Sequence, residues 1–140
     1  MANWNKIMEA YESNDCESLG EYAAELMNDL ADYFEDEGYY SGDIGMMVLG
    51  CALYFVNIDK FVDGGEEDVL RYALNDMGYQ YNFSMMRRDF DENGYSARIE
   101  SVMRGAPSRV REMFARLGCA VCSGKGYISA EERRVILKWV

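Results

Sequence analysis

The stretch from Asp89 to Glu100 carries oxygen ligands at the spacing of a calcium-binding loop. In such loops, carboxylate and amide oxygens at positions 1, 3, 5 and 12 surround a hard cation. Those positions are here filled by Asp89, Asp91, Asn93 and Glu100. Gly94 stands at the sharp turn, but the eighth position, usually apolar, is Ser96, and no second complete loop is present to pair with it. Two interpretations follow: a weak calcium site, or an acidic turn that Gly94 closes.

A second set of carboxylates is the next candidate for a cation. Asp59, Asp63 and Glu66 lie within eight residues of one another. The spacing Asp63-x-x-Glu66 is also that of a helix capping box, in which the two side chains bond to each other's backbone amides. Two uses therefore compete for Glu66, as a ligand and as part of a cap.

The same segment is repeated 66 residues further along the chain. DKFVDGGE at 59–66 matches KGYISAEE at 125–132, and each follows a small-residue-rich apolar stretch, GCALYFV or GCAVC. The second copy has its own capping box, Ser129-x-x-Glu132. The repeat predicts two helix-loop-helix units packed face to face, with the loops at 58–63 and 124–129 related by a pseudo-twofold axis.

The repeated pattern resembles the signature of the TerB family, in which Asp-Gly-x-Ile-Ser-x-x-Glu lies between two apolar helices. The matching positions are Asp59, Val62, Asp63 and Glu66 in the first copy, and Gly126, Ile128, Ser129 and Glu132 in the second. Lys60 replaces the glycine of the signature, and Lys125 replaces its aspartate. The resemblance covers roughly residues 43–78 and 107–140.

The resemblance implies a compact all-helical fold without known enzymatic chemistry. It also implies a place in tellurite-resistance, metal-related stress or phage-defence systems. Acidic residues near the loops of that family are suspected of binding cations. Lys125 departs from this expectation, because an ammonium group cannot ligate a divalent cation.

The net charge of −11 is unevenly distributed. Residues 1–76 hold 18 Asp and Glu against 3 Lys and Arg, whereas residues 77–140 hold 7 against 11. An acidic half repels nucleic acid and anionic lipid, and it attracts cations or basic proteins. The arginines of the basic half are scattered among acids, which argues further against nucleic acid. The basic half either faces a partner or folds against the acidic half, and of the two we expect internal pairing.

The second predicted helix, about Cys16 to Glu37, concentrates the negative charge. On a wheel of 100° per residue, six acidic side chains fall within about 120° of one another. They are Glu17, Glu21, Glu25, Asp29, Asp32 and Asp36. The opposite sector is apolar and suits a core. The acidic face is either solvated or a binding surface.

The residues that commonly carry catalysis are scarce. The chain has no histidine, so it lacks the commonest general base, and no nucleophile elbow, phosphate loop or dinucleotide motif is present. We therefore expect no enzyme. Cys16, Cys51, Cys119 and Cys122 are expected as reduced thiols, largely buried rather than liganded to zinc.

Helical spacing of the apolar residues runs through nearly the whole chain. With 49% hydrophobic residues and one proline, we expect a single all-α domain over residues 1–140, a bundle of about seven helices. The expected helices cover about 3–11, 16–37, 43–57, 63–77, 107–122 and 129–140, with shorter ones on either side of Asn93-Gly94.

No membrane span is expected, because the most apolar stretch, Ile44 to Ile58, falls short of the roughly 20 residues that cross a bilayer. The first residues lack the pattern of a secretion signal, so we expect a cytoplasmic protein.

Two functions remain open. The first is a non-enzymatic TerB-like stress-response domain that presents acidic surface to cations, calcium being the candidate, or to partner proteins. The second is an acidic protein-interaction module that imitates nucleic-acid charge toward a basic partner, in a phage-related setting.

Overall fold

Helices form in the segments where the apolar spacing predicts them. The computed structural model describes all of the chain except residues 1–2, 57, 59–63, 79–82 and 93. The helices are α1 (Trp4–Glu12), α2 (Cys16–Asp36), α3 (Ser41–Val56), α4 (Gly64–Asp76), α5 (Phe83–Glu92), α6 (Tyr95–Arg104), α7 (Ser108–Cys122), a 3-10 turn η1 (Ser123–Lys125) and α8 (Ala130–Leu137). Within the described residues there is no strand, so the all-α class is confirmed, with eight α-helices where about seven were expected.

Local signals account for several helix ends. The side chains of Asn3, Asp15 and Ser129 cap α1, α2 and α8, each accepting a backbone N–H of the first turn. Gly38 adopts a left-handed conformation with φ of 84° directly after α2, as the sequence predicts. The amide of Tyr39 then donates to the carbonyl of Phe34, which satisfies one of the last free carbonyls of the helix.

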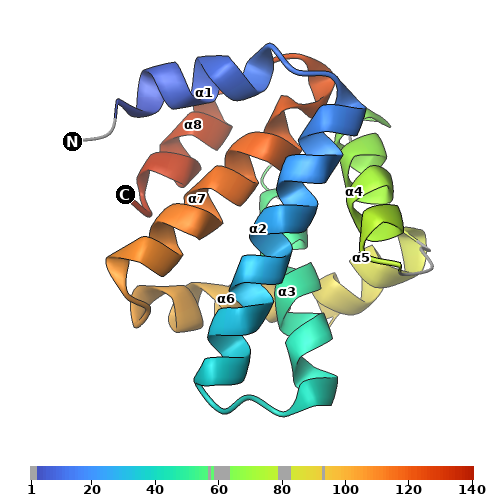
Figure 1. The fold of residues 1–140 in the computed structure, drawn as a ribbon, viewed down its shortest axis with the longest axis vertical. Helices are drawn as coiled ribbons and strands as arrows, with labels where there is room; N and C mark the ends of the chain where they lie inside the picture. Colours follow the sequence, from blue (N-terminus) through green and yellow to red (C-terminus); the bar gives the residue numbers. More distant parts are fainter. Residues whose placement is uncertain (1–2, 57, 59–63, 79–82, 93) are drawn as a thin grey trace.

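Helix α2 runs through the middle of the fold and packs against α3, α4 and α7 (Figure 1). Its buried face supplies Leu19, Met27 and Phe34 to the core. Helix α7 contacts α2, α3 and α8, and α1 lies against it near the chain ends. None of the helices in the described segments is long and apolar enough to cross a membrane.

Aromatic rings fill the contact between α3 and α7. Phe55 and Phe114 are fully buried with ring centroids 4.7 Å apart, and Trp139 meets Phe114 edge-on at 5.3 Å. A β-carbon at Gly118 would come within 2.5 Å of the Phe55 ring, so the helices approach closely because this position carries no side chain.

Two helical glycines differ in what surrounds them. A β-carbon at Gly20 of α2 would lie 2.4 Å from the Tyr72 β-carbon, whereas one at Gly45 of α3 would meet nothing within 4 Å. Gly20→Ala should therefore destabilise the protein by about 1–3 kcal/mol through overpacking. Gly45→Ala should stabilise it by roughly 0.5–1 kcal/mol, because alanine is the better helix former. Urea unfolding measures the change in the free energy of unfolding for each variant. A Gly20→Ala variant as stable as Gly45→Ala would contradict this packing.

Candidate interaction surface

The residues of the expected calcium loop are distributed over two helices. Asp89 and Asp91 belong to α5, and Glu100 belongs to α6. Glu100 Oε1 accepts hydrogen bonds from the Tyr54 hydroxyl at 2.9 Å and the Lys138 ammonium at 2.5 Å. The hydrogen bond from Lys138 lowers the pKa of Glu100 below its ordinary value.

This geometry gives the calcium prediction no support. The first residues of such a loop must curl around the ion, but helix α5 continues through Glu92. Asn93 lies outside the described residues. Across the described ranges, no three acidic or cysteine side chains are grouped as metal ligands.

The second candidate set differs from expectation at Glu66. Asp59 and Asp63 lie outside the described residues. Glu66 is 1% exposed, and its Oε1 accepts a hydrogen bond from the ammonium of Lys125 at 2.9 Å. This oxygen is therefore committed to a hydrogen bond from Lys125 and does not face solvent as a ligand.

Lys125 is the centre of a buried charge cluster formed by Glu66, Lys125 and Glu132. Its Nζ donates to Glu66 Oε1, to Glu132 Oε1 at 2.5 Å and to the Cys122 carbonyl at 3.1 Å. These contacts use all three donors of the ammonium group. Glu66 and Glu132 occupy equivalent positions of the repeated motif, so the two copies do converge on a positive charge. That charge belongs to the chain itself.

One carboxyl of the cluster keeps its proton at neutral pH. Burial raises the pKa of Glu66 to about 8, with Lys125 opposing the rise and Glu132 reinforcing it. Burial also disfavours ionised Glu132, but hydrogen bonds from Lys125 and the Ser129 amide hold its pKa below the ordinary value. The cluster is thus a neutral Glu66 beside an ionised Glu132 and Lys125 pair, which leaves no net charge in the interior.

The capping box of the second copy is formed as predicted. The Ser129 amide donates to Glu132 Oε1 at 2.8 Å, and the Glu132 amide donates to Ser129 Oγ at 3.2 Å. Glu132 therefore holds the start of α8 and the ammonium of Lys125 with the same oxygen. This double use was not visible from the capping pattern alone.

Two glycines let the cluster form. A β-carbon at Gly65 would lie 2.2 Å from the Gly124 carbonyl oxygen, and one at Gly124 would lie 2.4 Å from the Gly65 oxygen. The start of α4 and the η1 turn therefore touch backbone to backbone, which brings Glu66 within reach of Lys125. The thiol of Cys16 contacts the Gly124 carbonyl at 3.4 Å on the same side.

Burial of the cysteines is confirmed for three of the four. Cys51, Cys119 and Cys122 are buried, and Cys16 is half-buried. Burial raises the pKa of the Cys119 thiol to about 12 and that of Cys122 well above its ordinary value. Thiolates are therefore strongly disfavoured at these two positions, which suits packing rather than nucleophilic or redox chemistry.

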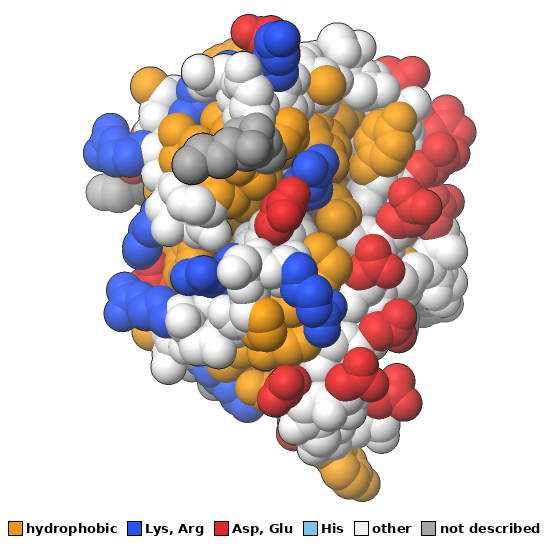
Figure 2. Space-filling view, turned by 60° about the vertical axis from the view of Figure 1, so that its left-hand side comes forward, with side chains coloured by type: hydrophobic (Ala, Val, Ile, Leu, Met, Phe, Trp, Pro, Cys, Tyr) orange, Lys and Arg blue, Asp and Glu red, His pale blue; other side chains and the backbone are white. Residues whose placement is uncertain are grey.

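The acidic face of α2 is exposed in the structure. All six of its carboxylate residues, Glu17, Glu21, Glu25, Asp29, Asp32 and Asp36, are exposed. Among the described side chains, no Lys or Arg forms an ion pair with any of them. Figure 2 shows acidic side chains gathered down one side of the molecule, apart from most of the basic ones.

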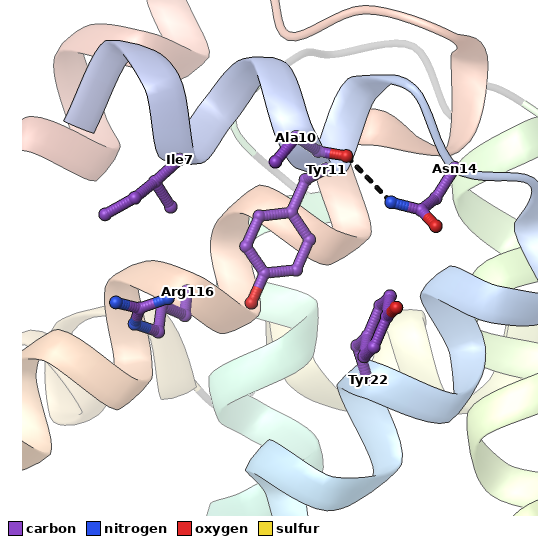
Figure 3. Close-up of a pocket in the computed structure, with 6 residues that line it drawn as sticks. All are labelled: Ile7, Ala10, Tyr11, Asn14, Tyr22 and Arg116. Carbon is purple, nitrogen blue, oxygen red and sulfur yellow. Dashed lines mark hydrogen bonds between the residues drawn. The ribbon is translucent and has the colours of Figure 1, made fainter. Parts of the chain in front are cut away.

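A cleft of about 250 Å³ lies between α1, α2 and α7 (Figure 3). Its polar groups are already engaged. Asn14 Nδ2 donates to the Ala10 carbonyl at 2.7 Å, and Arg116 pairs with Glu112 at 3.1 Å. Tyr11 and Tyr22 meet edge-on at 6.0 Å and line the rest. The cleft brings no set of free polar groups together.

A larger hollow of about 490 Å³ lies between α2, α3 and the end of α4. We call it the α2–α4 groove. It is lined by Met27, Asn28, Ala31, Ser41, Gly42, Ile44, Gly45, Met46, Val48, Leu49, Leu74 and Met77. The lining is mostly apolar, and Met46 is 49% exposed within it. No local sequence pattern indicates this groove, because its walls come from three helices.

Comparison with models of protein families, with curated proteins and with solved structures gives no match. The TerB resemblance therefore stays a prediction. The pseudo-twofold relation of the two loops also stays a prediction, because residues 59–63 of the first loop lie outside the described part of the chain.

The buried cluster predicts a pH-dependent stability. Folded Glu66 holds its proton up to a pKa of about 8, whereas an unfolded glutamate loses it near the ordinary pKa of 4.5. The unfolded chain therefore binds fewer protons in this window, so the free energy of unfolding falls as pH rises from 5.5 to 7.5. One proton gives at most about 1.4 kcal/mol per pH unit.

Glu66→Gln should remove this slope, because the amide can still accept from Lys125 but does not titrate. The exposed Glu131→Gln on α8 serves as the control and should keep it. The chain has no histidine, so no imidazole titrates between pH 5.5 and 7.5 and obscures the effect of Glu66. Urea unfolding at several pH values tests the effect, and a wild-type stability that stays constant or rises across the window would contradict it.

Proposed function

We propose that this chain is a non-enzymatic interaction module that binds a basic partner protein through the acidic face of α2. The observation that carries the proposal is the row of six exposed carboxylates without a basic side chain of the described chain paired to it. The segment from residue 16 to residue 58 contains no Lys or Arg at all. A surface of one sign attracts and orients a partner of the opposite sign.

The energetics of the helix support a partner rather than an isolated surface. Carboxylates at i and i+4, such as Glu17, Glu21 and Glu25, repel one another by a few tenths of a kcal/mol per pair. Packing of the apolar face offsets this cost in the free protein. Lysines or arginines from a partner would turn the repulsion into attraction, which gives binding a favourable electrostatic term that salt weakens.

The TerB resemblance supplies the proposed setting, a stress-response system of the tellurite-resistance kind. A basic partner whose usual ligand is nucleic acid fits the same surface, since carboxylates can take the place of phosphates. The genes beside this one provide a direct observation: tellurite-type stress genes favour the first setting, and phage genes favour the second.

A lysine-rich peptide of random-coil composition tests the proposal. The triple variant Glu21→Gln, Glu25→Gln and Asp29→Asn should bind it about tenfold more weakly than wild type, as the loss of three pairs of roughly 0.5 kcal/mol predicts. Fluorescence anisotropy at fixed salt measures the dissociation constants.

The matched control is Glu9→Gln, Glu92→Gln and Glu131→Gln, which changes the net charge equally at exposed positions away from α2. It should change the affinity much less. Equal weakening in the two triple variants would mean that total charge, and not the α2 face, determines binding.

Cation binding is the alternative, and calorimetry with calcium separates the two. Under the proposal the peptide binds equally well in calcium and in a chelator. A calcium-induced rise in melting temperature that Asp89→Ala with Asp91→Ala abolishes would favour the cation alternative instead.

A further inference from the structure

Each helix that lines the α2–α4 groove also carries an exposed carboxylate close in sequence to a lining residue. On α2, Asp32 stands four residues after Asn28 and directly after Ala31, both of which line the groove. On α3, Asp43 lies between the lining residues Gly42 and Ile44. Asp76 at the end of α4 precedes Met77. The three carboxylate residues, Asp32, Asp43 and Asp76, are exposed.

Basic residues are nearly absent from these walls. Helices α2 and α3 contain none. Helix α4 contains only Arg71, whose guanidinium pairs with Glu67 and Asp68 of its own helix. The groove therefore combines a mostly apolar lining with helices whose exposed charges are mostly negative.

We propose that this groove binds an amphipathic helix of a basic partner protein. The apolar side chains of that helix enter the groove, and its lysines and arginines face the exposed carboxylates of α2, of which Asp32 stands one turn after the lining residue Asn28. The inference rests on the proposed function and specifies where the partner is held. The negative charge of the helices around the groove selects the occupant, because an anionic lipid surface or an acidic helix would be repelled.

The groove suits a helix in size and in chemistry. A volume of about 490 Å³ admits several apolar side chains, such as those that a helix presents at positions i, i+3, i+4 and i+7. Met27, Met46 and Met77 are among the lining residues. Methionine is flexible and polarizable, so a surface rich in it adapts to side chains of different shape.

Gly45 provides a way to fill the groove without disturbing the fold. It is exposed and lines the groove, it has no positive φ, and a β-carbon there meets nothing within 4 Å. Gly45→Trp should place a large ring in the space that the partner's apolar side chains need. Gly45→Ala is the matched control, because it makes the same backbone change and leaves the groove open.

The probe is a synthetic amphipathic peptide of leucine and lysine with its apolar residues at helical spacing. By anisotropy, Gly45→Ala should bind it as wild type does. Gly45→Trp should bind it about tenfold or more weakly, a loss of roughly 1.4 kcal/mol. Met46→Gln, which keeps the size of the side chain and removes its apolar end, should weaken binding in the same direction. Far-ultraviolet circular dichroism and thermal melting confirm that each variant is folded.

Three results would overturn the inference. Unchanged affinity in both Gly45→Trp and Met46→Gln, with the α2 triple variant still weakened, would leave the proposed function intact but place the partner outside the groove. Equal binding of a peptide with serine in place of leucine would mean that charge alone is recognised. A dimer in light scattering that the peptide dissociates would identify a second copy of this chain as the occupant.

Discussion

The ammonium of Lys125, buried between Glu66 and Glu132, is the interaction on which the arrangement of the C-terminal helices depends. Removing three ionisable groups from water is costly, and only good geometry and full hydrogen bonding repay it. Here the ammonium uses all three donors and burial holds Glu66 protonated, but Glu66 Oε2 and Glu132 Oε2 are buried without a hydrogen-bond partner, so the compensation is incomplete. Loss of a single partner from a buried pair typically costs about 3–5 kcal/mol, because a charge is then left uncompensated. The cluster is therefore a strong constraint on where its helices lie.

The constraint extends from the cluster to the proposed binding surface. Glu66 lies in the first turn of α4, and α4 packs along α2 with Gly20 against Tyr72. The backbone contact between Gly65 and Gly124 fixes the start of the same helix. The far end of α4 supplies Leu74 and Met77 to the groove. A buried ion pair and two glycines thus determine the position of one groove wall at the other end of the helix.

The helices were predictable because their signals are local. Apolar spacing, the caps at Asp15 and Ser129 and the left-handed Gly38 each act within a few residues, so the elements and the exposed face of α2 follow from the sequence. The role of Glu66 does not, because its partner lies 59 residues away along the chain. In isolation, Lys125 indicates a lost cation site. In the fold, its ammonium lies between the two glutamates and donates a hydrogen bond to each.

The calcium-loop pattern from Asp89 to Glu100 also shows that a sequence pattern does not by itself determine the local backbone conformation. Spacing specifies which oxygens are present, but not whether the backbone curls around an ion or continues as a helix. Asp89, Asp91 and Glu92 also suit the exposed side of an amphipathic helix, and α5 takes that form. Glu100 accepts hydrogen bonds from Tyr54 and Lys138, which lie 46 and 38 residues away along the chain. A local sequence pattern includes neither of them.

The distribution of ion pairs bears most directly on function. Among the described side chains, only two contacts between an acidic and a basic residue join the acidic half to the basic half: Lys125 with Glu66, which burial holds protonated, and Arg133 with Glu12. The other ion pairs lie within one half, such as Arg116 with Glu112 and Lys138 with Glu100. The carboxylates of α2 are therefore not neutralised by folding. Their repulsion persists in the free protein and is screened only over about 10 Å at ordinary salt. A basic partner bound beside α2 would reduce that repulsion and would also cover the apolar groove. Electrostatic attraction and burial of apolar surface would therefore favour the same binding site.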